Sequence, residues 1–386
     1  DMLGLTKIEF NADKLRDVID GLSYGFGELA DWDKDHVFLD NPVHNKPFIK
    51  LEDGRYYSVI VYLFYHLGVD LLENLLRQEQ QLFNYYVQEK GKYLERKLED
   101  MLHAAFPNGK LYSGSQWKCE NSSKIFENDL ILVIEQFAVV IEAKSGMVTP
   151  PARRGAPGRL FETLKELVVE PSVQSMRFVD FLKANPGINR FSTKAGKVNE
   201  VDTTKVKYFI PLGVTLSSLG AIGSNLKKLI DSKITDRTLY ELAPSISLCD
   251  LETIFDILEL QSEKIHYLIR RREFDAHARF HGDELDLFGF YLDNGFNIGE
   301  AEFDNNFYLD LILKSKELDP YVLGTAKGIK VKKPFLAKTK FWADILGKLD
   351  GKGVSWLEAS YILLNAPAED QLKFEKKFEL LKELLR

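Results

Sequence analysis

Three side chains in the middle of the chain have the types and spacing of a reactive group: the carboxylates of Asp129 and Glu142 and the amine of Lys144. Carboxylate oxygens suit hard divalent cations such as magnesium. A lysine beside such an ion can orient or help deprotonate a metal-bound water, and it can offset the negative charge that builds on a phosphate under attack. The alternative is an ordinary Asp or Glu to Lys salt bridge at a solvent-facing end of a sheet, because ion-pair networks occupy such positions as well.

Two short apolar runs within residues 125–144 must position these groups. Each run is rich in Val and Ile and too short to favour a buried helix, so we expect two adjacent antiparallel strands. If the Glu-Gln dipeptide between them forms a two-residue turn, the ladder sets Asp129 opposite Glu142. The two-residue alternation puts Lys144 on the same face, opposite Glu127. Because the runs are apolar on both faces, these charges need a partner or an ion.

The motif formed by Asp129, twelve intervening residues and Glu142-Ala143-Lys144 resembles that of the PD-(D/E)xK nuclease superfamily, most closely its NERD-like branch. Asn128 stands where the name-giving proline would be. The expected order over residues 80–216 is helix, strands, helix, strand, and it resembles the family as well. The resemblance implies an α/β fold with a restriction-endonuclease-like mixed β-sheet core flanked by helices.

Two further residues enter through this resemblance. The family carries a glutamate on its first helix, a few residues after a glycine, and Gly91 followed by Glu95 matches that spacing. Related nucleases carry a glutamine on the helix after the motif, where Pro171 and Ser172 are plausible start signals and Gln174 lies in the first turn. Gln174 would orient the substrate or Lys144. For both residues the alternative is a solvated helix side chain.

The resemblance implies a nuclease that uses Mg²⁺ or Mn²⁺ to hydrolyse phosphodiester bonds of nucleic acid, DNA rather than RNA, in defence or repair. Asp129, Glu142 and the Ala143 carbonyl would hold the metal, with Glu95 assisting, and Lys144 would position the attacking water. The alternative is a nuclease fold that has become a catalytically inactive binding or scaffolding module acting with a protein partner. The intact charged set argues against that alternative, since an unpaired charge is costly in a covered sheet.

Several cationic residues outside the motif are candidates for contact with nucleic acid. We expect residues 149–170 to form a loop at the mouth of the site, where Arg153, Arg154 and Arg159 could reach phosphates. Lys332 and Lys333 belong to a basic strip interleaved with aromatic residues, and a further basic cluster occupies residues 270–272. A solvated surface has the same composition.

The 386 residues are 45% apolar and carry a formal charge of −7, which argues against a surface built for indiscriminate binding of nucleic acid. We expect a helical accessory or cap region at residues 1–79, the nuclease-like core at 80–216 and a mainly helical region at 217–386. The helical flanks offer surfaces for a protein partner or a second copy of the chain.

Other sequence features bear on location and on competing chemistry. The apolar stretch 56–69 is shorter than a membrane span, so we expect a buried helix and no membrane contact. Two separated cysteines, Cys119 and Cys249, suggest neither a disulfide framework nor a zinc cluster, and a reducing cytoplasm is the expectation. His277 and His281, four apart on an expected helix, are a weaker zinc alternative that lacks the HExxH glutamate.

Overall fold

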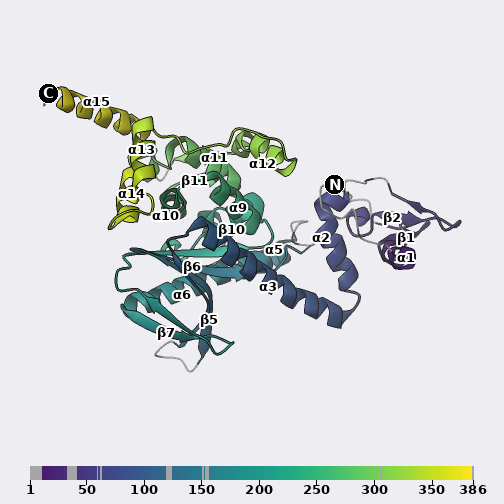
Figure 1. Ribbon diagram of the computed structural model, residues 1–386. Coiled ribbons are helices and arrows are strands. Elements are labelled where there is room, and N and C mark those ends of the chain that lie inside the picture. Colours follow the sequence, from purple (N-terminus) through teal and green to yellow (C-terminus); the bar gives the residue numbers. More distant parts are fainter. Residues whose placement is uncertain are drawn as a thin grey trace. The chain divides into compact units, whose positions relative to one another are not determined.

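The computed structural model describes residues 11–32, 41–58, 60, 63–118, 124–149, 152, 156–304 and 307–384. The chain forms two compact units (Figure 1), residues 1–92 with 148–160, and residues 93–147 with 161–386. The domain boundaries expected after residues 79 and 216 stay predictions.

A mixed sheet of seven strands is the centre of the larger unit, and it confirms the expected α/β class with a mixed sheet flanked by helices. The strand order is β10-β9-β6-β5-β4-β7-β8. β6, β9 and β10 pair in parallel, and the remaining neighbours pair antiparallel. The strands span Lys110–Lys118 (β4), Ile125–Ile134 (β5), Phe137–Lys144 (β6), Ile188–Ser192 (β7), Val198–Asp202 (β8), Tyr208–Thr215 (β9) and Ser245–Ser247 (β10).

The register of the β5–β6 hairpin is the one expected from the sequence. Ile134 pairs with Phe137 across a two-residue turn, and pairing continues outward to Leu130 and Ile141. Glu135 takes a left-handed conformation with φ 49° at the first turn position, which reverses the chain tightly. The next pair of positions along this ladder is Asp129 and Glu142.

Helices cover both faces of the sheet. On one face lie the C-terminal half of α3 (Gln80–Ala105), through Leu94 and Leu98, and the helices α9 (Leu248–Ile257) and α10 (Gln261–His277). On the other face α6 (Glu170–Ala184) packs Phe178 onto β5 and β6. The helices that follow the sheet in the sequence therefore share one hydrophobic core with it.

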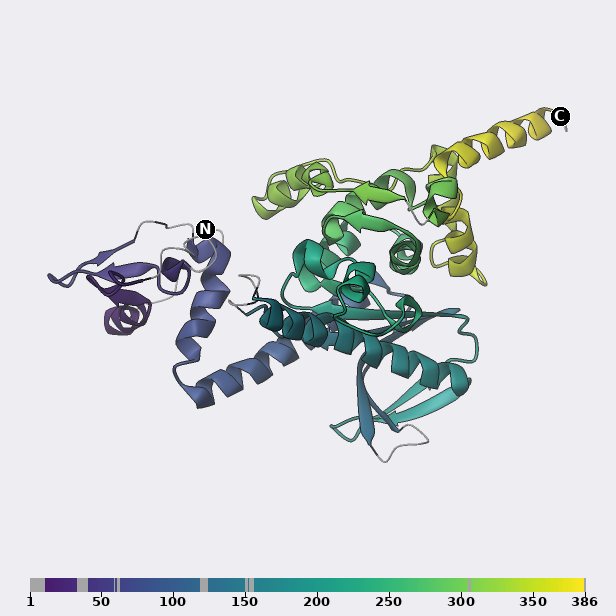
Figure 2. The same ribbon diagram turned by 180° about the vertical axis from the view of Figure 1, so that it is seen from behind.

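The stretch expected as a loop, residues 149–170, instead contains the helix α5 (Pro157–Leu164), which runs through a π-helical turn at Lys165–Val169 into α6. Figure 2 shows these elements as one continuous teal helix along the sheet. The expectation was wrong because buried apolar residues, among them Leu164 and Leu167, drive helix formation here. Pro171 lies in the first turn of α6, as expected, directly after the π turn, where the missing proline N–H is tolerated.

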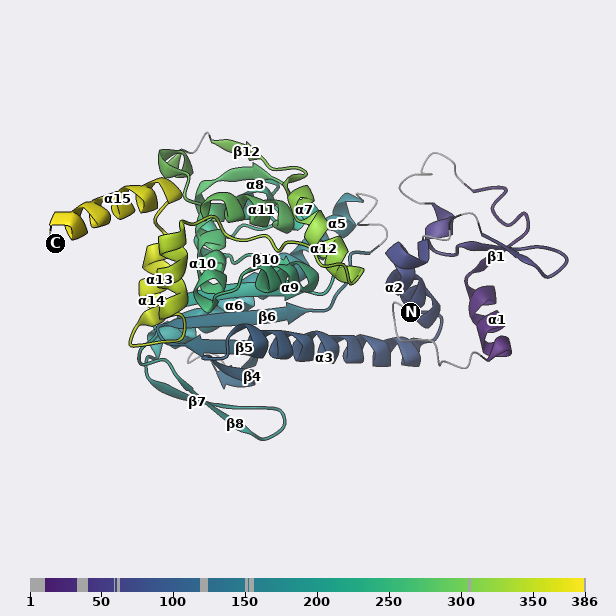
Figure 3. The ribbon, with the colours of Figure 1, turned by 45° about the horizontal axis from the view of Figure 1, so that its top comes forward.

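The β7–β8 hairpin projects from the β4 side of the sheet (Figure 3) and pairs with β4 at Gln116 and Ser192. Asn199 of β8 donates from its side chain to the Ser113 carbonyl at 2.8 Å and to Ser115 Oγ at 3.0 Å. The hairpin is thereby fixed to β4, which places its tip near the strand ends.

The remaining elements of the larger unit include short strands, single turns and helices: α7 (Gly220–Gly223), α8 (Leu226–Asp231), η4 (Leu239–Glu241), β11 (Arg279–His281), α11 (Glu284–Asn294), η5 (Gly299–Phe303), β12 (Tyr308–Asp310), η6 (Lys314–Glu317), α12 (Asp319–Ala326), α13 (Lys340–Leu349), α14 (Trp356–Leu364) and α15 (Ala368–Leu384). Several of these elements, among them α11, α13 and α14, share the hydrophobic core of α9 and α10.

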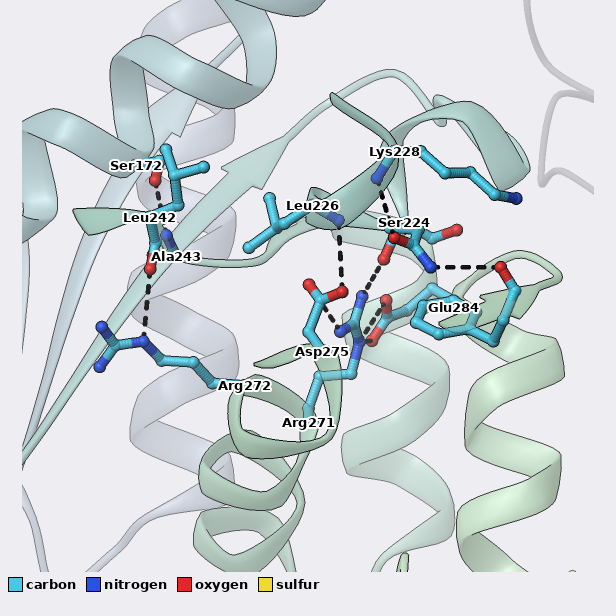
Figure 4. A network of polar contacts seen from close by, with 12 residues as sticks. Ser172, Ser224, Leu226, Lys228, Leu242, Ala243, Arg271, Arg272, Asp275 and Glu284 are labelled. Atoms are coloured by element: carbon cyan, nitrogen blue, oxygen red, sulfur yellow. Dashed lines mark hydrogen bonds and ion pairs between the residues drawn. The ribbon is translucent and has the colours of Figure 1, made fainter. Parts of the chain in front are cut away.

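The basic cluster at residues 270–272 is mostly buried, so the nucleic-acid interpretation of that cluster is wrong. Arg271 is 1% exposed and pairs with Glu284 at 3.0 Å and with Asp275 at 3.3 Å (Figure 4). Arg270 is also buried and pairs with Glu302 at 2.7 Å. These guanidinium groups join α10 to its neighbours.

The smaller unit contains α1 (Ala12–Gly21), η2 (Pro42–His44), α2 (Leu63–Leu76) and the first half of α3. A three-stranded sheet lies among them, with strands Ser23–Gly25 (β1), Phe48–Lys50 (β2) and Tyr56–Tyr57 (β3). The buried Glu73 of α2 accepts from Lys90 Nζ at 2.8 Å and from Tyr86 Oη at 2.9 Å, which ties α2 to α3.

Two helix expectations outside the core need correction. Residues 56–57 form a strand rather than the start of a buried helix, and Val69 on α2 is 62% exposed. His277 ends α10 while His281 lies in β11, so the two histidines do not share a helix. Among the described residues no helix has the length and apolar character needed to cross a membrane.

Candidate active site

A pocket of about 350 Å³ opens at the end of the β5–β6 ladder, where the two strands separate. It brings together the side chains that the sequence singled out from four different elements. The pocket lining includes Glu95 of α3, Asp129 of β5, Glu142, Ala143 and Lys144 of β6, and Gln174 of α6.

Three hydrogen bonds that involve side chains continue the pairing of β5 and β6 beyond the backbone ladder. Asp129 Oδ2 accepts from the Ala143 N–H at 2.7 Å. Asn128 Nδ2 donates to Glu142 Oε1 at 3.0 Å and to the Ile141 carbonyl at 3.1 Å. Each carboxylate is thus held by the opposite strand, which keeps the two groups side by side.

Burial and mutual repulsion dominate the electrostatics of this pair. Glu142 is 3% exposed, and burial followed by the negative charge of Asp129 raises its pKa to about 8. Burial also raises the pKa of Asp129, against the Ala143 N–H and the charge of Lys144, which both lower it. Without a cation, the pair therefore tends to retain a proton near neutral pH.

Lys144 lies beside this pair and is oriented by α6. Its Nζ donates to Gln174 Oε1 at 2.7 Å, and both side chains are half-buried. A glutamine oxygen accepts a hydrogen bond without adding charge, so it fixes the direction of the amine and leaves its positive charge facing the pocket. The contact expected for Gln174 is present.

Glu95 lies at the rim, one residue after the buried Leu94 that anchors this turn of α3. Its pKa is raised, first because neighbouring atoms exclude water from part of its surroundings and then because of the charges of Asp129 and Glu127. A carboxyl group that holds a proton more strongly than usual is suited to proton transfer at the mouth of a site.

Sequence reasoning missed Lys194, which comes from the β7–β8 turn. Its Nζ pairs with Glu127 Oε2 at 2.8 Å and lines the same pocket. Gly196, with φ 77°, marks the turn. That turn signal could have located the hairpin, but only the folding of β7 against β4 brings Lys194 to Glu127.

Aromatic side chains form the floor beside the charged groups. Trp117 of β4 and Phe126 of β5 have ring centroids 5.1 Å apart. The Arg177 guanidinium of α6 lies over the Phe126 ring at 4.6 Å, so a cation is held at the edge of the pocket.

Of the other proposed nucleic-acid contacts, none that the structure describes lines this pocket. Arg153 and Arg154 lie outside the described residues, and Arg159 is exposed on α5 in the smaller unit. Lys332 and Lys333 line a separate hollow of about 270 Å³ that they share with Asp293 and Glu317. In that hollow the Lys332 amine lies over the Phe335 ring at 5.4 Å.

Whether a divalent cation fits the pocket depends on the oxygen ligands that line it. Across the described part of the chain, no group of three or more His, Cys, Asp or Glu side chains is arranged to hold a metal ion. Of the four carboxylates that line the pocket, two are neighbours on the paired strands, Asp129 and Glu142, and they lie beside the Ala143 main chain. That smaller set fits Mg²⁺, which keeps several waters and is commonly held by one or two carboxylates plus substrate phosphate.

Comparisons of the chain with protein-family models, with curated proteins and with solved structures found no match. The chemistry of the pocket therefore rests on its own residues.

Proposed function

We propose that this protein is a metal-dependent nuclease with a restriction-endonuclease-like core, of the PD-(D/E)xK type. The observation that carries the proposal is the convergence of a buried carboxylate pair, Asp129 and Glu142, with Lys144 held by Gln174 in one pocket. A structural salt bridge would need only one carboxylate beside the lysine. A second buried carboxylate, whose pKa is raised to about 8, shows that the ionised pair needs a positive counter-charge, which a bound cation would supply.

In this proposal Asp129, Glu142 and the Ala143 carbonyl hold Mg²⁺ or Mn²⁺, with Glu95 assisting directly or through water. The bound ion would supply Lewis acidity toward the phosphate oxygens and lower the pKa of water. The hydrogen bond from the Ala143 N–H to Asp129 Oδ2 supports this arrangement, because it fixes one carboxylate without neutralising its charge.

Side chains of the pocket would position the attacking water and offset the negative charge on the phosphate. Lys144 Nζ has donors left after its bond to Gln174, so it can hold the attacking water and offset charge on the phosphate. Attack by that water breaks one phosphorus–oxygen ester bond and leaves a phosphate monoester and a hydroxyl.

Cleavage assays test the proposal. Linear, circular and single-stranded DNA and RNA are each incubated with Mg²⁺, Mn²⁺ or EDTA, using the wild type, Lys144→Ala and Asp129→Asn. The matched controls are Lys348→Ala and Asp231→Asn, at exposed positions that do not line the pocket.

We expect metal-dependent cutting that is lost in both pocket variants and kept in both controls. The same panel tests the expectation that DNA is preferred to RNA. Absence of cutting on every substrate, or cutting that persists in Lys144→Ala, would contradict the proposal. The first of these results would favour an inactive nuclease fold that binds a protein partner.

A further inference from the structure

A second hollow, of about 720 Å³, adjoins the candidate active site. The two hollows share three lining residues, Lys124, Gln174 and Arg177, so they lie side by side. Gln174 stands at the junction, because its Oε1 accepts from Lys144 in the first pocket. A chain molecule that reaches Lys144 could therefore extend into the second hollow.

One wall of the second hollow is a single face of the continuous α5–α6 helix. Glu170, Val173, Gln174 and Arg177 follow the three- and four-residue spacing that aligns side chains along one helix face. Upstream, Phe161 of α5 and Lys165 of the π turn extend this wall. Because the helix is uninterrupted, this wall continues away from the candidate active site.

Residues 233–237 form the facing wall, and hydrogen bonds hold this segment in shape. Lys233 adopts a left-handed conformation with φ 57°, and the Ile234 N–H donates to the Leu229 carbonyl at 2.9 Å. Farther along, Arg237 Nη1 donates to Glu241 Oε1 at 3.0 Å. The wall is therefore formed before any ligand arrives.

Two contacts drawn in Figure 4 fix the end of this wall to the helices behind it. The Ala243 N–H donates to Ser172 Oγ of α6 at 2.6 Å. Arg272 of α10 donates from Nε to the Leu242 carbonyl at 3.3 Å. The segment that carries the facing wall is thereby tied to α6, which forms the other wall.

The hollow gathers positive charge in a chain whose formal net charge is −7. Five cationic side chains line it against three carboxylates: Lys124, Lys165, Arg177, Lys233 and Arg237 against Glu170, Asp236 and Glu241. Phe161 is 40% exposed and offers an aromatic surface. Cationic groups along a groove with an aromatic platform are the features that bind single strands without reading sequence.

We propose that this second hollow receives the segment of a single nucleic-acid strand that flanks the bond held at Lys144. The proposal rests on the proposed nuclease function and names its substrate as single-stranded at this point. Arg177 contacts the phosphate next to the reacting one, Lys165 and Lys233 contact phosphates beyond it, and a base stacks on Phe161. A hollow of about 720 Å³ suits a ligand of small-molecule size, such as a short piece of one strand, rather than a duplex.

Binding measured without cleavage tests this inference. The full chain is titrated in EDTA against a fluorescein-labelled single-stranded DNA oligonucleotide and its blunt duplex, with fluorescence anisotropy as the readout over a range of salt. The variants are the double substitution Lys165→Ala with Lys233→Ala, and separately Phe161→Ala. The matched control replaces two exposed lysines of α15, Lys376→Ala with Lys377→Ala.

We expect the wild type to bind the single strand more tightly than the duplex. Removing the two lysines should weaken single-strand binding roughly tenfold and reduce the slope of log affinity against log salt by about 1.4, which is about 0.7 for each lost contact. Phe161→Ala should lose on the order of tenfold through lost stacking. The α15 control should bind as the wild type does.

Equal affinity and equal salt slope in the double lysine variant would overturn the inference, as would a preference for duplex or no binding of the single strand. Because these readouts need no metal and no cleavage, they fail separately from the proposed function. Loss of cutting with binding intact would contradict the nuclease proposal alone. If the protein cuts nucleic acid but its binding of the single strand does not depend on Lys165 and Lys233, the proposed role of the second hollow is contradicted and the nuclease proposal is not.

Discussion

The carboxylate pair is held together by the residues around it. Asp129 accepts a hydrogen bond from the Ala143 N–H, and Glu142 accepts one from the side-chain amide of Asn128, which is fully buried. The alternation of the two strands was enough to predict that Asp129 and Glu142 are neighbours. The role of Asn128 could not be predicted in that way, because its side chain reaches Glu142 across the end of the ladder.

The pKa of Glu142 leads to a prediction about stability. Its folded-state pKa is about 8 against an ordinary value of 4.5, so between these values the folded state binds more protons than the unfolded state. The free energy of unfolding of the metal-free protein should therefore fall as the pH rises from about 5 to about 8. Glu142→Gln should remove most of this fall and be more stable than the wild type at pH 8, by on the order of 1–2 kcal/mol.

Urea unfolding in EDTA at pH 5.5, 7 and 8.5 measures this difference. Glu252→Gln, at an exposed position of α9, is the matched control and should follow the wild type. A Glu142→Gln protein that loses stability with pH as steeply as the wild type would show that Glu142 does not carry the shift.

Gln174 gives a prediction about positioning. It touches Lys144 through Oε1, so Gln174→Ala should lower kcat roughly 10–100-fold and change KM less, as expected when a supporting hydrogen bond is lost. Gln174→Glu keeps an oxygen acceptor and should recover part of the rate. A Gln174→Ala enzyme with wild-type kcat would show that α6 does not orient the lysine.

Among the elements, the long helix formed by α5, the π turn and α6 differs most from the sequence expectation. Its prolines and glycines indicated a loop, yet Pro157 is the first residue of α5 and Pro171 follows the π turn. Local turn signals cannot reveal that the apolar residues between them find a core to pack on. The helix expected after the motif and the strand that follows it could be predicted, because α6 buries one face at helical spacing and β9 is a continuous buried apolar run.

The buried ion pairs of α10 lead to a prediction at this scale. Arg271→Ala would leave Asp275 and Glu284 buried without their cation, and burial already raises the pKa of Asp275 to about 6. Loss of one partner from such a group costs about 3–5 kcal/mol of unfolding free energy. Urea unfolding of Arg271→Ala beside the exposed control Arg279→Ala tests this cost, and a difference below about 1 kcal/mol would contradict it.

At the scale of the whole molecule, the main feature is that the sheet of the larger unit and its two covering layers bring together distant parts of the sequence. Residues from α3 to α14 share one hydrophobic core, so the C-terminal helices support the sheet from one side while α6 covers the other. The sequence predicted the helices but not their partners, because helix periodicity identifies an apolar face without showing what will cover it. The same limit applies to Lys194, which reaches the pocket only through the β7–β8 hairpin.

The central claim is that Asp129 and Glu142 together hold a divalent cation, and it can be tested without knowing the substrate. Isothermal titration calorimetry with Mn²⁺ at pH 7 and pH 8.5 should show binding to the wild type that tightens with pH, because the cation displaces the proton retained by Glu142. Asp129→Asn should lose this binding while Asp231→Asn keeps it. Mn²⁺ uptake that is absent from the wild type, or equal in Asp129→Asn, would contradict the claim.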